Sequence, residues 1–151
     1  MNEFLTISPT FYGMSIVPKK YWKDYGFALL TIAGADGDVS DPEMDWLTED
    51  LGQSLKVGTD LIAAWEEFDW ENADLGEIFQ RLNPNQIANY SKLMLYDAIR
   101  MSYADGDFSD KERESVDECA RILKVNKETV MAMEALVEME RAADKLRQTI
   151  L

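Results

Sequence analysis

ADGDVSDPE at residues 35–43 returns as ADGDFSDKE at residues 104–112, and this repeat decides how the chain is organised. Seven of the nine positions are identical. Each copy follows a stretch whose apolar residues have helical spacing. Gly37 and Gly106 fall where such a helix would end in a left-handed residue, which glycine accepts without steric cost. Each copy therefore predicts a turn between two helices.

Both turns also contain residues that start helices. Ser109 and Glu112 have the spacing of a capping box, in which the two side chains satisfy free backbone N–H groups reciprocally. In the first copy Asp41 precedes Pro42, and proline is favoured as the first residue of a helix. Helix capping accounts for the serine, the glycine and about half of the acids in each turn.

The repetition extends beyond the turns. The tripeptide LKV recurs at residues 55–57 and 123–125, each time before a further apolar helix pattern. The two halves, about residues 20–70 and 84–150, each have the order helix, acidic turn, short helix, linker and helix. We expect an all-α fold, a compact bundle of about seven helices built from two three-helix repeats with approximate two-fold symmetry.

The two ends of the chain have patterns of their own. Residues 1–19 mix prolines and a glycine with aromatic side chains, and we interpret them as an irregular arm that packs on a single helical domain at residues 20–151. After Asn126, apolar residues alternate at spacings of four and three, which is typical of a seam that packs along another helix. A dimer could use such a seam, but we expect it to pack within the molecule. The seam residues are Ala132, Leu136, Met139, Ala143, Leu146 and Ile150.

Composition limits the possible chemistry. The formal charge of −14 argues against nucleic acid as a partner and favours cations or basic protein surfaces. Histidine is absent, which removes the common zinc sites and all imidazole-based mechanisms. Cys119 lies in an apolar stripe, where a buried and unreactive thiol is expected. We therefore expect no enzyme and no organic cofactor. Without a transmembrane stretch or an export signal, we expect a cytoplasmic protein with no direct membrane insertion.

The remaining acids point to a cation. Aspartates at the end of a helix face the negative pole of its dipole, and both turns nevertheless place two of them there. Hard oxygen ligands favour Ca²⁺, Mg²⁺ or Mn²⁺. An EF-hand requires glycine at the sixth loop position, where this chain has Asp41 or Asp110, so we expect weak binding, roughly 10⁻⁵ to 10⁻³ M. The candidate ligands are Asp36, Asp38, Ser40, Glu43, Asp105, Asp107, Ser109 and Glu112.

The doubled pattern Ala-Asp-Gly-Asp-x-Ser-Asp-x-Glu resembles the TerB-like tellurite-resistance family, over about residues 20–150. The resemblance implies a compact helical domain of about seven helices with internal two-fold symmetry. It also implies resistance to tellurite and other chemical stress, without an established enzymatic reaction, and a metal-binding role for the acidic turns. The residues that would have this role are Asp36, Asp38, Glu43, Asp105, Asp107 and Glu112.

Two functions are favoured over a third, a metal-assisted hydrolase that would need a pocket and a carboxylate base beside the acidic turns. One is a stress-response module that binds divalent cations at the acidic turns. The other is a protein-interaction module in which the turns only cap helices and an aromatic surface, near Phe11 and Tyr12 or within residues 65–70, anchors a partner. We expect these aromatic side chains to belong to the core instead. We also expect protein partners, but neither their identity nor the oligomeric state follows from the sequence.

Overall fold

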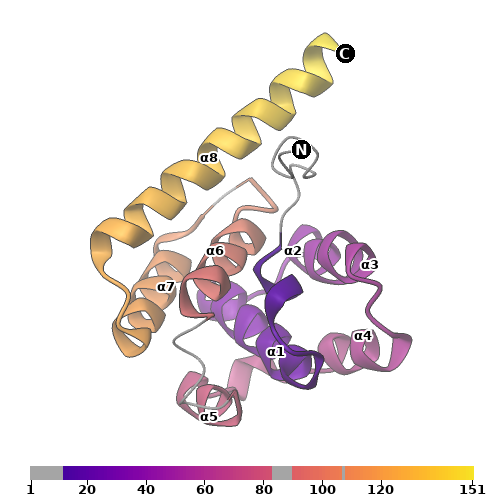
Figure 1. Cartoon of the computed structure of the whole chain (residues 1–151), viewed down its shortest axis with the longest axis vertical. Helices are drawn as coiled ribbons and strands as arrows, with labels where there is room; N and C mark the ends of the chain where they lie inside the picture. Colours follow the sequence, from indigo (N-terminus) through magenta and orange to yellow (C-terminus); the bar gives the residue numbers. More distant parts are fainter. Residues whose placement is uncertain (1–11, 83–89, 107) are drawn as a thin grey trace.

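A computed structural model describes residues 12–82, 90–106 and 108–151, and within these ranges the chain forms helices and no strand (Figure 1). The predicted all-α fold is confirmed. The helices are α1 (Trp22–Ala33), α2 (Asp41–Asp45), α3 (Gly52–Ser54), α4 (Thr59–Glu66), α5 (Leu75–Arg81), α6 (Ser91–Ser102), α7 (Asp110–Leu123) and α8 (Lys127–Ile150). The shorter segments are η2 (Gly13–Ile16), η3 (Lys19–Tyr21), η4 (Gly34–Asp36), η5 (Trp46–Leu51) and η6 (Trp70–Asn72).

The α1 and α6 helices pack against each other at the centre of the fold. They have equivalent places in the two sequence repeats, because each one precedes an acidic turn. The α1 helix also contacts α4 and α5, while α6 contacts α7, α8 and η2. Both helices are buried over most of their length, which explains why their apolar residues are not confined to one narrow stripe. Their largest fully buried side chains are Tyr25, Leu29, Leu30, Ile32, Met94 and Leu95.

A glycine inside α1 allows one close helix contact. The indole ring of Trp65, from α4, lies directly over Gly26, where a Cβ atom would come within 2.1 Å of the indole nitrogen. That nitrogen donates a hydrogen bond to the backbone carbonyl of Lys23, at 3.2 Å. The close contact offsets the low helix propensity of glycine at this position.

The local conformation of the two linkers is repeated. Lys56 and Lys124, at the centre of the two LKV sequences, both have positive φ, at 56° and 60°. Each linker then leads into the next helix, α4 or α8. The match between the tripeptides therefore predicted a real structural equivalence. The two-fold symmetry of the whole bundle stays a prediction.

The helix after the first acidic turn continues through a glycine. The segments α2, η5 and α3 follow one another without a break, and Gly52 is buried in close contact with Ile62. None of the helices within the described ranges combines the length and hydrophobicity needed to cross a bilayer.

The prediction that the apolar seam of the last helix packs within the molecule is wrong. The α8 helix packs on α6 and α7 through Val130 and Val137, whereas the apolar seam predicted to pack within the molecule lies mostly at the surface. Four seam residues are among the most exposed large apolar side chains: Leu136, Met139, Leu146 and Ile150. By contrast, Tyr12 and Trp65 are buried as core residues, as predicted, while Phe11 lies outside the described residues.

Candidate functional site

Both acidic turns have the backbone conformation that their glycines predict. Gly37 and Gly106 have φ values of 99° and 89°, in the left-handed region. The Gly37 N–H donates to the carbonyl of Gly34 at 3.0 Å, and the Gly106 N–H to that of Tyr103 at 2.8 Å. These bonds close the end of the preceding helix in each half of the chain and turn the backbone towards the next one.

Each following helix starts with a complete capping box. The Ser40 N–H donates to Glu43 Oε1 at 2.8 Å, and the Glu43 N–H donates back to Ser40 Oγ at 3.3 Å. The second copy repeats this with Ser109 and Glu112, at 3.0 and 3.1 Å. In the first copy the cap is thus Ser40, not Asp41, which is the first helical residue. In each glutamate, Oε1 therefore accepts a hydrogen bond from the backbone of its own capping serine.

The other oxygen of each glutamate is buried and has no donor. Glu43 and Glu112 are each 1% exposed, and Oε2 of both has no hydrogen-bond partner if both groups are ionised. The two carboxyl groups lie close enough to bond to one another, so one shared proton would satisfy both oxygens. Burial and the bond to Glu112 raise the pKa of Glu43 to about 9, and burial also raises the pKa of Glu112.

The aspartates of the turns lie outside this buried pair. Asp36 is exposed, its Oδ1 accepts a hydrogen bond from the Asp38 N–H at 3.2 Å, and its negative charge further raises the pKa of Glu112. Asp38 and Asp105 are also exposed, and Asp107 lies outside the described residues. In the part of the chain that is described, no three acidic side chains are arranged to hold a metal ion as they stand. The structure thus unites the two turns at one place, through Glu43 and Glu112.

A third buried acid escaped the sequence analysis. Asp97 in α6 is fully buried and accepts hydrogen bonds from the Gly13 N–H at 3.0 Å, the Met14 N–H at 3.0 Å and the Tyr25 hydroxyl at 2.8 Å. Burial raises its pKa to about 6, although these bonds and nearby Arg100 lower it. Asp97 therefore ties η2 and α1 to α6, which is a structural role.

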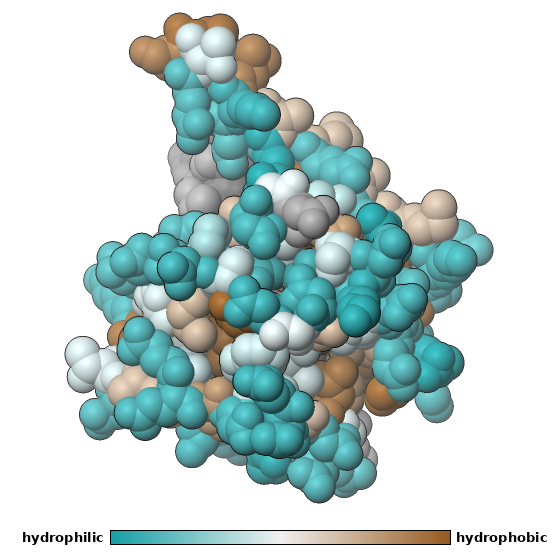
Figure 2. Space-filling view, turned by 180° about the vertical axis from the view of Figure 1, so that it is seen from behind, coloured by the Kyte–Doolittle hydropathy of each residue, from teal (hydrophilic) through white to brown (hydrophobic). Residues whose placement is uncertain are grey.

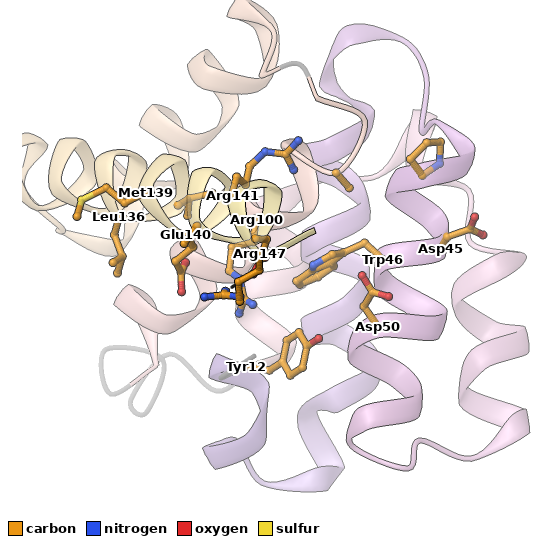
Figure 3. A pocket seen from close by; sticks show the side chains of 15 residues that line it. Tyr12, Asp45, Trp46, Asp50, Arg100, Leu136, Met139, Glu140, Arg141 and Arg147 are labelled. Atoms are coloured by element: carbon orange, nitrogen blue, oxygen red, sulfur yellow. Dashed lines mark hydrogen bonds and ion pairs between the residues drawn. The ribbon is translucent and has the colours of Figure 1, made fainter. Parts of the chain in front are cut away.

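A cavity of about 550 Å³ lies between α8 and the segments α2 and η5, which follow the first acidic turn. Figure 3 shows the α8 residues Glu140 and Arg147 on one side of it and Tyr12 and Trp46 on the other, with Arg100 between them. The Tyr12 and Trp46 rings meet edge to face at 5.8 Å, and the Arg100 guanidinium lies 4.9 Å from the Tyr12 ring. These contacts fix the floor of the cavity, whereas its α8 wall is formed in part by the exposed seam.

Comparisons with known proteins agree on one family. A sequence model described as tellurite resistance protein TerB matches residues 27–135. A crystal structure of a tellurite resistance protein from Nostoc punctiforme is similar to this chain, with 30% sequence identity and a TM-score of 0.72. The similarity covers 85% of this chain and 78% of that protein. No curated protein matches.

Proposed function

The chain belongs to the TerB family, and on that premise we propose that it is a non-catalytic, cytoplasmic stress-response module that binds a divalent cation through its two acidic turns. The descriptions of the family and of the similar protein from Nostoc punctiforme both name tellurite resistance. We include a contribution to tellurite resistance in the proposal for this chain. The cation would connect the two halves of the bundle where the turns meet.

One observation supports cation binding most directly: two glutamates are buried where glutamine would cap equally well. A capping box accepts glutamine in place of glutamate, and the boxes use only Oε1 of Glu43 and Glu112. Burying a second carboxylate beside the first costs free energy unless a positive charge compensates it. The two unpartnered Oε2 atoms are therefore the atoms that a cation would bind.

The surrounding donors favour a hard divalent cation. Asp36 and Asp38 of the first turn and Asp105 of the second offer exposed carboxylates near the helix ends, and Asp107 has the equivalent place in the sequence. The hydroxyls of Ser40 and Ser109 already accept backbone N–H bonds. Oxygen donors of this kind suit Ca²⁺, Mg²⁺ or Mn²⁺.

The alternative is a protein-interaction module in which the acidic turns serve only as helix caps. It is favoured by the completeness of both capping boxes and by the shared proton that can satisfy the glutamate pair without a metal. In that case the functional surface lies elsewhere, and the exposed seam of α8 is a candidate, because it contains four of the exposed large apolar side chains within the described residues. The two proposals make opposite predictions for added cations.

Thermal unfolding and calorimetry with Ca²⁺, Mg²⁺ and Mn²⁺ test the proposal. An ion at about a hundred times its Kd stabilises the folded state by about 2.7 kcal/mol, which raises the Tm by roughly 5 to 11 °C. The variant Glu43→Gln keeps an oxygen for the Ser40 N–H and gives Glu112 a neutral N–H donor, so it imitates the protonated pair. It should fold, unfold at the same or a higher temperature without ions, and lose the response to them.

The exposed acid Asp60, at the start of α4, provides the matched control. Asp60→Asn should respond to cations as the wild type does, because it lies outside both turns. If the wild type shows neither binding heat nor a Tm shift at millimolar ion concentration, cation binding is excluded and the capping alternative holds. If Glu43→Gln still responds, the ion binds elsewhere.

A further inference from the structure

The α8 helix has two apolar faces, and the body of the molecule covers only one. Val130 and Val137 are 2% exposed and pack on the body, where Glu134 pairs with Arg113 at 2.7 Å. The end of α8 then projects beyond the other helices, away from α7 (Figure 1). Seen from behind, hydrophobic side chains lie at the tip of this projection, where the chain ends (Figure 2).

The uncovered face is the seam of Ala132, Leu136, Met139, Ala143, Leu146 and Ile150. Met139 is 68% exposed, Leu146 59% and Ile150 66%. Nine residues separate Val130 from Met139, and likewise Val137 from Leu146, which is two and a half turns of an α-helix. Met139 and Leu146 therefore lie on the side of α8 opposite Val130 and Val137, and Met139 also lines the edge of the cavity beside Tyr12 and Trp46. Another helix can reach the seam from this side without obstruction from α6 or α7.

We infer that α8 pairs with the α8 helix of a second copy of this chain, antiparallel and along the seam. The spacing of four and three residues is that of a coiled-coil seam, which requires a facing helix with the same repeat. A second copy supplies such a helix. A two-fold axis through the region of Arg141 brings the same surface of each copy into contact.

The charges of α8 are complementary to themselves in this orientation. Residues 128–140 contain four acidic residues and no basic one, whereas residues 141–151 contain three basic residues and one acidic residue. An antiparallel pair places the acidic half of each helix along the basic half of the other. A parallel pair would align like charges.

The side-chain sizes are complementary as well. With the axis near Arg141, Met139 lies beside the partner's Ala143, Leu136 beside the partner's Leu146, and Ala132 beside the partner's Ile150. Small residues thus face large ones in two of the three layers, which permits close packing. The net charge of −14 on each chain opposes association, but salt at physiological concentration screens charges separated by more than about 8 Å.

The first test measures the mass of the protein in solution by sedimentation or light scattering over a range of concentrations. We expect twice the 17.3 kDa of one chain at high concentration. The double variant Leu146→Glu, Ile150→Glu should weaken the dimer at least about a hundredfold, because each change occurs twice in a symmetric dimer. Both positions are exposed, so the fold should persist, as circular dichroism can verify. The control Met131→Glu changes an apolar residue that is 57% exposed but lies outside the seam, and it should dimerise normally.

A second test determines the orientation of the helices by disulfide cross-linking. Residues 132 and 150 of one helix are about 27 Å apart, so Ala132→Cys, Ile150→Cys should cross-link between copies, while Ile150→Cys alone should not. The native Cys119 is buried and does not interfere. A mass of one chain at millimolar concentration overturns the inference. A dimer that survives the double variant, or efficient cross-linking of Ile150→Cys alone, overturns it too.

Discussion

Asp97→Asn should destabilise the protein by about 2 kcal/mol, because one buried N–H loses its acceptor. In the wild type, Oδ1 accepts one hydrogen bond, from Gly13, and Oδ2 accepts two, from Met14 and Tyr25. Asparagine has a single carbonyl oxygen. If that oxygen replaces Oδ2 and accepts from Met14 and Tyr25, the amide NH₂ group replaces Oδ1 and faces the Gly13 N–H. Two hydrogen-bond donors then face each other. Alanine would leave all three donors and Arg100 without the carboxylate, at a cost of about 3 to 5 kcal/mol.

Urea and thermal unfolding at pH 7 measure these losses. For a chain of this length, 2 kcal/mol corresponds to a decrease in Tm of roughly 4 to 8 °C. Asp60→Asn, an exposed substitution of the same type, should change the Tm by less than a degree or two. Amide hydrogen exchange adds a local measurement, since Gly13 and Met14 should exchange faster in Asp97→Asn. If the variant unfolds within about 0.5 kcal/mol of the wild type, Asp97 does not hold η2 and α1 to α6.

The same variant makes a prediction about pH. Burial raises the pKa of Asp97 from 3.8 to about 6, so between these values the folded protein holds a proton that the unfolded chain has released. The stabilisation from this group is complete below pH 4 and is lost as the pH rises through 6. Two pKa units correspond to about 3 kcal/mol. The stability difference between wild type and Asp97→Asn should therefore be larger at pH 4 than at pH 7, and a constant difference would contradict the assignment.

Three further substitutions test the packing and the turns. Gly26→Ala should cost about 3 kcal/mol or more in urea unfolding, because the new Cβ would overlap the Trp65 ring. Gly58→Ala has no atom within 4 Å of the new Cβ and should cost at most about 1 kcal/mol, because alanine is a poorer N-cap of α4 than glycine. Ser109→Ala should lower the free energy of unfolding by about 1 kcal/mol through loss of the cap, and a change near zero would mean that the box contributes nothing. Lys124→Gly should raise the Tm by a few degrees, because glycine adopts a φ of 60° without strain, and an unchanged or lower Tm would contradict this.

The sequence predicted the fold class and the local chemistry of the turns, because both depend on short-range rules. The φ values of Gly37 and Gly106 and the bond between Ser109 and Glu112 follow from the requirements of a few neighbouring residues. The sequence did not predict that Glu43 and Glu112 meet, since this depends on how two segments about seventy residues apart pack. A signal for their burial was nevertheless present. Glu43 stands four residues before Leu47 on the same helical face, and Glu112 stands four before Val116.

Asp97 could have been recognised in the same way. It lies three residues after Met94 and four before Met101, within the apolar face of α6. An acid at such a position is either buried with partners or marks an error in the assigned face. The partners could not be inferred, because two of them are backbone N–H groups of η2, whose conformation depends on contacts distant in sequence.

The misassigned face of α8 shows what periodicity alone cannot determine. The helix carries a long apolar stripe, the seam, and a short one around Val130 and Val137, and the longer stripe was assigned to the core. The body, however, extends along only part of α8, so two valines and Met133 suffice to dock it. A stripe that continues beyond the surface on which its helix packs cannot be satisfied by that surface. The seam reaches Ile150, at the projecting end, and its length therefore indicates an occupant from outside the chain's own core.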